Sequence, residues 1–242
     1  MRYLVLAFIL LMACSKPESN CFKNAGEEIT ISQQLGSVTE IEIYDNPLVE
    51  IVHDSVALIE ISYPENLIDG VIFELENGLL KIDNANRCRW LKDLSIRPKI
   101  KLHCNLSSLK STKHYGAGNL TFMDSIRSPE FVFEQWDAAG DSKILYSGAS
   151  ILIKQNTGPG NISCSGKTEN LYFYNTSLGS LNAEYLSANN GYLISNSHRV
   201  SSASVSESCR IEIFGKGDIN LCPSPKTLEV TKAGEGQVSI CE

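Results

Sequence analysis

Polar and apolar residues alternate in seven short blocks along the second half of the chain. Each block starts from a glycine or a serine. The first and third residues after it are polar, and the second and fourth are apolar, with Ser142 as the one exception. Alternation with a period of two predicts a strand with one buried face. The starting residues are Gly118, Gly140, Gly160, Gly179, Ser201, Gly217 and Gly236.

The blocks recur at intervals of 22, 20, 19, 22, 16 and 19 residues. A strand that recurs with this period is typical of a stacked repeat, in which each coil buries its apolar residues against its neighbours. Apolar pairs such as Ile151 with Ile153, and Ile211 with Ile213, precede the blocks and predict a second strand in each coil. The pattern therefore predicts an all-β fold, a parallel β-helix (solenoid) with coils of about 20 residues.

Four of the blocks carry two glycines, as in Gly158-Pro159-Gly160. We interpret these glycines as corners, where the chain needs the positive φ that glycine tolerates. A phosphate-binding loop would need a helix after the glycines, and a calcium-binding roll would need a nine-residue repeat. Neither alternative fits strands that recur about every 20 residues. The polar residues Asn119, Asp141 and Asn161 fall in one column, and we expect them to hydrogen-bond along the stack.

The first half of the chain is also rich in β-strand patterns, but it is less regular. The dipeptide Asn77-Gly78 between two alternating segments predicts a β-hairpin. No Pro- or Ser-rich linker interrupts residues 27–242, so we expect one continuous domain there. The expected strands before residue 90 cover 38–44, 49–53, 56–63, 71–76 and 79–83.

The N-terminus has the pattern of an export signal. A basic start is followed by an apolar run over 3–12, which is too short to span a bilayer as a helix. The sequence Leu11-Met12-Ala13-Cys14 resembles a bacterial lipobox, which implies cleavage before Cys14 and acylation of that cysteine. An ordinary signal peptide is the alternative. We therefore divide the chain into a lipoprotein signal peptide (1–13), a polar tether (14–26) and the β-helix domain (27–242). No aspartate follows Cys14, which by resemblance to lipoprotein sorting rules favours the outer membrane.

Composition agrees with an exported and folded protein. The formal net charge of −7 disfavours nucleic acid and anionic lipid as partners. Cys222 and Cys241 each lie five residues beyond a corner in neighbouring coils, where a spacing of about 4.8 Å makes them a candidate disulfide. Cys164 falls on an inward position. No Cys-x-x-Cys motif is present in the sequence, so we expect no metal and no cofactor.

Several short motifs together resemble a known family. The lipobox, the Asn77-Gly78 hairpin, the segments 98–102 and 115–120, and the repeated Gly-x-Gly-Asn/Asp-Ile motif look like the putative auto-transporter adhesin, head GIN domain family. The match covers roughly 37–240. The resemblance implies a right-handed β-helix in a bacterial envelope protein, often a lipoprotein, and it brings no catalytic motif. This chain lacks the family's glycines in two places between 176 and 205.

Two classes of function compete, with a purely structural envelope role as a third. The first is a non-enzymatic module that binds glycan or protein through outward aromatic residues, although isolated aromatics are also common on sheets. The second is a polysaccharide lyase or glycoside hydrolase, which needs opposed carboxylates or a metal-binding acid cluster. Glu134, Glu212 and Glu229 are scattered over distant coils, so we expect no enzyme. The candidate contact residues are Trp136, Tyr172, Tyr174 and Phe214.

Overall fold

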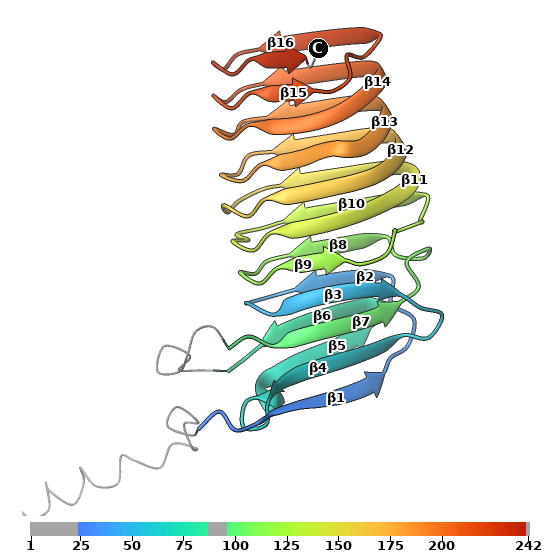
Figure 1. Ribbon diagram of the computed structural model, residues 1–242, viewed down its shortest axis with the longest axis vertical. Helices are drawn as coiled ribbons and strands as arrows, with labels where there is room; N and C mark the ends of the chain where they lie inside the picture. Colours follow the sequence, from blue (N-terminus) through green and yellow to red (C-terminus); the bar gives the residue numbers. More distant parts are fainter. Residues whose placement is uncertain (1–23, 87–95, 241–242) are drawn as a thin grey trace, which may run out of the picture.

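The computed structural model describes residues 24–86 and 96–240, which fold as a parallel β-solenoid. These residues form seventeen strands and a short 3-10 turn, η2 (Ile68–Gly70), and they contain no α-helix. The strands stack along one long axis (Figure 1) and hydrogen-bond into one continuous sheet. The structure thus confirms the all-β solenoid and its less regular N-terminal half. We call the two long sides of the stack side 1 and side 2.

Side 1 begins at the N-terminal end of the stack and ends near the C-terminus. Each of its strands pairs with the next one along the stack, and four long strands contribute their second halves to it. In spatial order the strands are β5 (Val71–Glu76), β6 (Leu79–Asn84), β2 (Glu40–Ile43), β8 (Ser111–His114), β10 (Glu130–Gln135), β11 (Ser142–Gln155), β12 (Ile162–Asn175), β13 (Leu181–Ser195), β14 (Ser201–Ile213) and β16 (Thr227–Lys232).

Side 2 runs beside it and includes the first halves of β11 to β14. Below those strands, again in spatial order, lie β1 (Glu28–Gln34), β4 (Leu58–Pro64), β7 (Lys99–Cys104), β3 (Leu48–His53) and β9 (Leu120–Phe122). Above them lie β15 (Ile219–Leu221) and β17 (Val238–Ile240). Both sides are parallel throughout except at the N-terminal end, where β1, β4 and β5 pair antiparallel.

The core fills the space between the two sides, as the alternation predicts. Ile144 and Ile162 point inward and are at most 1% exposed, whereas Ser163 faces solvent. Ser142, the exception in the pattern, is also buried, and its hydroxyl lies 3.0 Å from Nε2 of Gln135, which donates to it. An inward polar residue is tolerated there because it has a hydrogen-bond partner.

The fifth block corrects the predicted register. Ser202 pairs with Asn182, and Ala203 pairs with Ala183, so Ser201 lies beside Leu181 and not beside Gly179. The place of the block's starting glycine is taken by Arg199, whose carbonyl lies against Gly217 in the next coil. A shift of two residues keeps the same side chains inward, which is why the face assignment survives the error.

The glycines of the corners are needed for a different reason from the one we predicted. Among the paired glycines of these blocks, Gly158 has a positive φ, of 96°. At the others the constraint is close approach between coils. A Cβ atom on Gly160 would overlap the carbonyl oxygen of Gly140, and one on Gly236 would overlap that of Gly217. Glycine is required because each loop lies directly on the backbone of the loop below.

The N-terminal half does not stack in the order of its sequence. The coil formed by β2 and β3 lies between the coil of β6 and β7 and the coil of β8 and β9. The chain leaves this coil, turns back through β4 and β5, and passes through the predicted hairpin at Asn77-Gly78, where both residues have positive φ. It then returns past the coil of β2 and β3 to begin the regular stack (Figure 1).

Candidate functional site

The outer face of side 1 carries the most distinctive side chains of the described surface. Because the strands pair in parallel and in register, equivalent residues form columns across the strands at intervals of about 4.8 Å. Every second residue of a strand points outward. The resulting face is a flat array in which the neighbour of each side chain is fixed by strand pairing.

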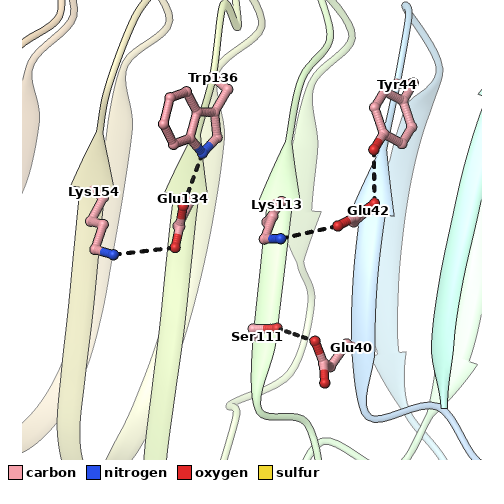
Figure 2. A network of polar contacts seen from close by, with 8 residues as sticks. All are labelled: Glu40, Glu42, Tyr44, Ser111, Lys113, Glu134, Trp136 and Lys154. Carbon is pink, nitrogen blue, oxygen red and sulfur yellow. Dashed lines mark hydrogen bonds and ion pairs between the residues drawn. The ribbon is translucent and has the colours of Figure 1, made fainter. Parts of the chain in front are cut away.

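One column of this face is a ladder of alternating charge. In-register pairing places Lys81, Glu42, Lys113, Glu134 and Lys154 side by side on five adjacent strands. Figure 2 shows two of the ion pairs: Lys113 Nζ lies 3.1 Å from Glu42 Oε1, and Lys154 Nζ lies 3.4 Å from Glu134 Oε1. The second pair joins two successive coils, because its members are 20 residues apart in the sequence.

Glu42 is the most buried member of the ladder, with 9% of its surface exposed. Burial opposes its ionisation, but hydrogen bonds from Tyr44 and Lys113, with the charges of Lys113 and Lys81, outweigh burial and lower its pKa. The same contact raises the pKa of Lys113. The carboxylate is therefore ionised and held in place, and is not poised for proton transfer at neutral pH.

Next to the charge ladder, three aromatic residues directly follow three strands that are adjacent in the stack, β2, β8 and β10. Tyr44 and Tyr115 stack with ring centroids 4.6 Å apart and an interplanar angle of 4°. Trp136 comes directly after β10 and is 38% exposed. Figure 2 shows Tyr44 donating from its hydroxyl to Glu42 (2.7 Å) and Trp136 donating from Nε1 to Glu134 (2.9 Å). We call Tyr44, Tyr115 and Trp136 the aromatic platform.

A second aromatic cluster lies further along the same face. Tyr172 and Tyr192 are in-register neighbours on β12 and β13, and Tyr174 lies two residues along from Tyr172. Arg210 stands over the Tyr192 ring at 5.5 Å, and both residues donate hydrogen bonds to Glu212 at 2.9 Å. Tyr172 and Tyr174 are 42% and 39% exposed, and among the described residues neither hydroxyl has a hydrogen-bond partner.

All four predicted contact residues lie on this face. Tyr172 and Tyr174 share one strand, whereas Trp136 and Phe214 share one column with three strands between them. Trp136 and Tyr174 are two strands apart, which connects the platform to the second cluster. Sequence reasoning missed Tyr44, Tyr115 and Tyr192. Tyr192 could have been found from its outward position beside Tyr172, but Tyr44 could not, because the place of β2 in the stack is not sequential.

The outer face of side 2 carries fewer large side chains along the regular stack. From β9 to β17 its central column consists of small polar residues and one lysine: Thr121, Lys143, Ser163, Asn182, Ser202, Asn220 and Ser239. Towards the N-terminal end the same column continues as the charged residues Glu50, Lys101 and Glu60. At its edge the predicted polar ladder is confirmed. The backbone N–H of Asp141 donates to Asn119 Oδ1 (3.1 Å), and that of Asn161 donates to Asp141 Oδ1 (2.9 Å). These side chains tie one loop to the next, so their role is structural.

A buried polar column runs inside the solenoid at the end of the side 1 strands. It consists of His114, Gln135, Gln155, Asn175 and Ser195, each at most 1% exposed. Gln155 Nε2 donates to the carbonyl of Gly160 (2.8 Å), and His114 Nδ1 lies 3.1 Å from the Ser142 hydroxyl. Burial lowers the pKa of His114 to about 4, although a hydrogen bond with the Gly118 backbone opposes this. Continued alternation beyond pairs such as Ile151 and Ile153 could have revealed this column.

Of the three carboxylates weighed for catalysis, two have ion-pair partners, and the third, Glu229, is exposed on β16 in register with Arg210. Glu134 is paired with Lys154, and Glu212 with Arg210. Among the described residues no group of three His, Cys, Asp or Glu side chains is arranged to hold a metal ion. His103 Nδ1 lies 3.4 Å from Asp54 Oδ2, and His103 Nε2 lies 3.8 Å from Glu60 Oε2.

The cysteines divide into one cross-linked and three buried residues within the described ranges. Cys222 is disulfide-bonded, and Cys241, its predicted partner, lies outside the described residues, so the pairing stays a prediction. Cys104, Cys164 and Cys209 are free and buried, and burial raises the pKa of each thiol to about 12. These three are core residues with no reactivity at neutral pH.

The predicted signal peptide, Cys14 and most of the tether also lie outside the described residues. Within the described ranges, none of the secondary structure is a helix with the length and apolar character needed to cross a membrane.

Fold and surface together define a parallel β-solenoid with one aromatic side. The chain belongs to the family described as "Putative auto-transporter adhesin, head GIN domain", whose model matches residues 38–225. This confirms the family resemblance found in the sequence. No curated protein matches the chain.

Three solved structures are similar in fold. A "putative adhesin" from Bacteroides fragilis has a TM-score of 0.80 at 15% identity, covering 89% of this chain and 97% of that one. A "putative lipid binding protein" from Parabacteroides distasonis has a TM-score of 0.67 at 17% identity, with 90% and 98% covered. A "putative adhesin" from the same species has a TM-score of 0.63 at 16% identity, with 89% and 98% covered. At these identities the likeness shows the fold alone.

Proposed function

We propose that this protein is a lipid-anchored, non-enzymatic module of the bacterial cell envelope that binds glycan or protein partners through the outer face of side 1. The observation that carries the proposal is the band of partly exposed aromatic residues on a rigid sheet, from the aromatic platform to Tyr172 and Tyr174. Aromatic side chains bury a large area on binding and lose little conformational freedom. The adhesin-like description of the family agrees with this role.

The charged groups of the same face favour binding over catalysis. A hydrolase or lyase needs a carboxylate or base that is free to attack or to exchange a proton. Glu42, Glu134 and Glu212 each accept hydrogen bonds from a cationic neighbour, so these carboxylates serve as supports for the aromatic rings.

The binding test uses paired substitutions on β12. Tyr172→Ser with Tyr174→Ser removes two exposed rings, and we expect weaker retention on immobilised host-type glycans or envelope proteins with an unchanged melting temperature. Ser163→Ala on side 2 is the control and should retain binding. Unchanged retention in the tyrosine variant would remove the proposed site. Cleavage of an acidic polysaccharide by the purified protein would overturn the non-enzymatic class, and Glu134, Glu212 and Glu229 would then be the first residues to substitute.

The anchor is tested separately. We expect Cys14→Ser to release the protein from the outer-membrane fraction or to leave it unprocessed, because acylation at this cysteine would supply the membrane attachment. Fractionation and gel mobility identical to those of the natural protein would contradict the lipoprotein assignment. Cys21→Ser, a nearby cysteine outside the lipobox, is the matched control.

A further inference from the structure

We propose that the ligand is an uncharged glycan chain that crosses the strands of side 1, with Tyr44, Tyr115 and Trp136 as its stacking subsite. This inference rests on the proposed function and names the class of ligand. It adds two residues, Tyr44 and Tyr115, that come together only because β2 lies beside β8 in the stack.

Two of the three polar tips of the platform, those of Tyr44 and Trp136, are used within the protein. The Tyr44 hydroxyl donates to Glu42, and Trp136 Nε1 donates to Glu134, so the exposed part of these side chains is ring carbon. A ligand that seats here gains from apolar C–H groups packed on aromatic rings and not from hydrogen bonds to the ring substituents. Pyranose rings present such C–H groups on their faces while their hydroxyls point outward at the edges.

The charge of the neighbouring column selects against an ionic ligand. Glu74, Lys81, Glu42, Lys113, Glu134 and Lys154 stand in one row of alternating sign, three negative and three positive, so their charges cancel. The Lys113 and Lys154 ammonium groups already have carboxylate partners. Lys81 stands in register between Glu74 and Glu42. A polyuronic acid or sulfated glycan would therefore meet no excess of positive charge in this row and would approach a protein of net charge −7.

The dimensions favour a chain over a single sugar. Three rings that follow adjacent strands span about 10 Å, and Tyr174 on β12 extends the track by two more strands, about 10 Å further. Lys154 of β11 and Asn156, which directly follows β11, lie between Trp136 and Tyr174. The exposed hydroxyls of Tyr172 and Tyr174 donate to no partner among the described residues. Several successive sugar units would thus contact a stacking subsite at one end and hydroxyl donors at the other.

The experiment uses Trp136 as its own reporter. The chain has two tryptophans, Trp90 and Trp136, so Trp90→Phe leaves Trp136 as the single emitter. The full chain in detergent is titrated with neutral hexasaccharides (cello-, manno- and chitohexaose) and with oligogalacturonate and hyaluronan hexamers. We expect at least one neutral hexamer to shift the Trp136 emission, and the acidic hexamers to leave it unchanged.

Variants then locate the subsite by calorimetry with the responding hexamer. Trp136→Ala should weaken binding by about tenfold or more, and Tyr115→Ala by a smaller factor. Tyr185→Ala removes an aromatic residue that is 77% exposed but lies outside this face, and it should bind like the natural protein. Melting temperatures measured for each variant separate loss of contact from loss of fold.

The outcomes distinguish this inference from the proposed function. Binding of acidic hexamers alone, or neutral binding that Trp136→Ala leaves intact, overturns the uncharged-glycan platform. If no hexamer binds while the protein still captures an envelope or host protein through Tyr172 and Tyr174, the glycan inference fails and the proposed function stands. If the protein retains neither glycan nor protein, both fail together.

Discussion

The two outer faces of the solenoid share one backbone and differ in the side chains that they present. From β9 to β17, side 2 shows a column of serine, threonine and asparagine with one lysine, whereas side 1 shows stacked aromatics beside a ladder of paired charges. Side 2 has a charged column of its own at its N-terminal end, formed by Glu50, Lys101 and Glu60, but no aromatic residues stand in that column. Both faces stand on the same kind of inward apolar residues. Stacking therefore needs only the inward positions and the glycine corners, and the aromatic residues of side 1 are not explained by the requirements of the fold.

The largest expected effect tests the premise that inward and outward positions are independent. Ile162→Asp places an uncompensated charge between two coils and should lower the free energy of unfolding by several kcal/mol, because Ile162 is 1% exposed. Ser163→Asp, one residue along on the face of side 2, should change it by about 0.5 kcal/mol or less. Equal shifts in the chemical denaturation midpoints of the two variants would mean that the outward positions of side 2 tolerate a charge no better than the inward positions.

The second prediction concerns the buried column behind side 1. The pKa of His114 is lowered to about 4 in the folded protein, against about 6.5 when unfolded, so the unfolded state binds more protons between these values. Its contribution is fully present above pH 6.5 and is lost as pH falls towards 4. We expect a loss on the order of 3 kcal/mol across this window. Urea denaturation at a series of pH values measures it.

His114→Gln is the matched variant for this test, because Gln135 and Gln155 occupy the same column in the next two coils. The difference between the natural and variant curves removes the titration of the carboxylates that both share. We expect that difference to slope between pH 6.5 and 4 and to be flat above. Parallel curves throughout the range would show that His114 is not the group responsible.

The smallest predicted effect compares an ion pair on each side. Lys113→Met leaves the buried Glu42 carboxylate with one partner fewer and should lower the free energy of unfolding by about 1 kcal/mol. We expect this loss to be larger in low salt, and larger than the loss caused by breaking an ion pair on side 2. Lys99→Met breaks the Lys99–Glu28 pair, whose side chains are 59% and 53% exposed, and should be close to neutral. Thermal melts of both variants at two salt concentrations decide whether the ladder of side 1 stabilises the sheet. Equal losses of stability in the two variants would contradict the prediction that the ladder of side 1 stabilises the sheet more than the exposed pair of side 2.

Much of the fold was predictable because a solenoid repeats its own constraints. Alternation around Gly160 identified Ile162 as buried and Ser163 as exposed, and the Asn119–Asp141–Asn161 ladder followed from the period. The fifth block was wrong by two residues because no glycine marks that corner. The corner glycines were assigned to positive φ, since the close approach of successive loops is a tertiary constraint that local sequence does not display.

The candidate site was predictable only in part, for a topological reason. Tyr172 and Tyr174 lie within one strand, so alternation alone put them on the same face. Trp136 was identified as outward. Its neighbours Tyr44 and Tyr115 follow two paired strands that are far apart in the sequence: Glu40 of one pairs with Ser111 of the other, 71 residues later. Such a juxtaposition depends on which coil stacks on which, and periodicity within a single strand carries no information about it.

The displaced coil of β2 and β3 also bears on how the protein is made. Both of its stacking neighbours, the coils of β6–β7 and β8–β9, emerge later from the ribosome than the coil itself. One edge of this coil stays unpaired until β6 and β7 are synthesised, and the other until β8, which pairs Ser111 with Glu40 across 71 residues of sequence. A simple one-by-one addition of coils cannot begin before then, so stacking suits a chain that is available as a whole before it folds.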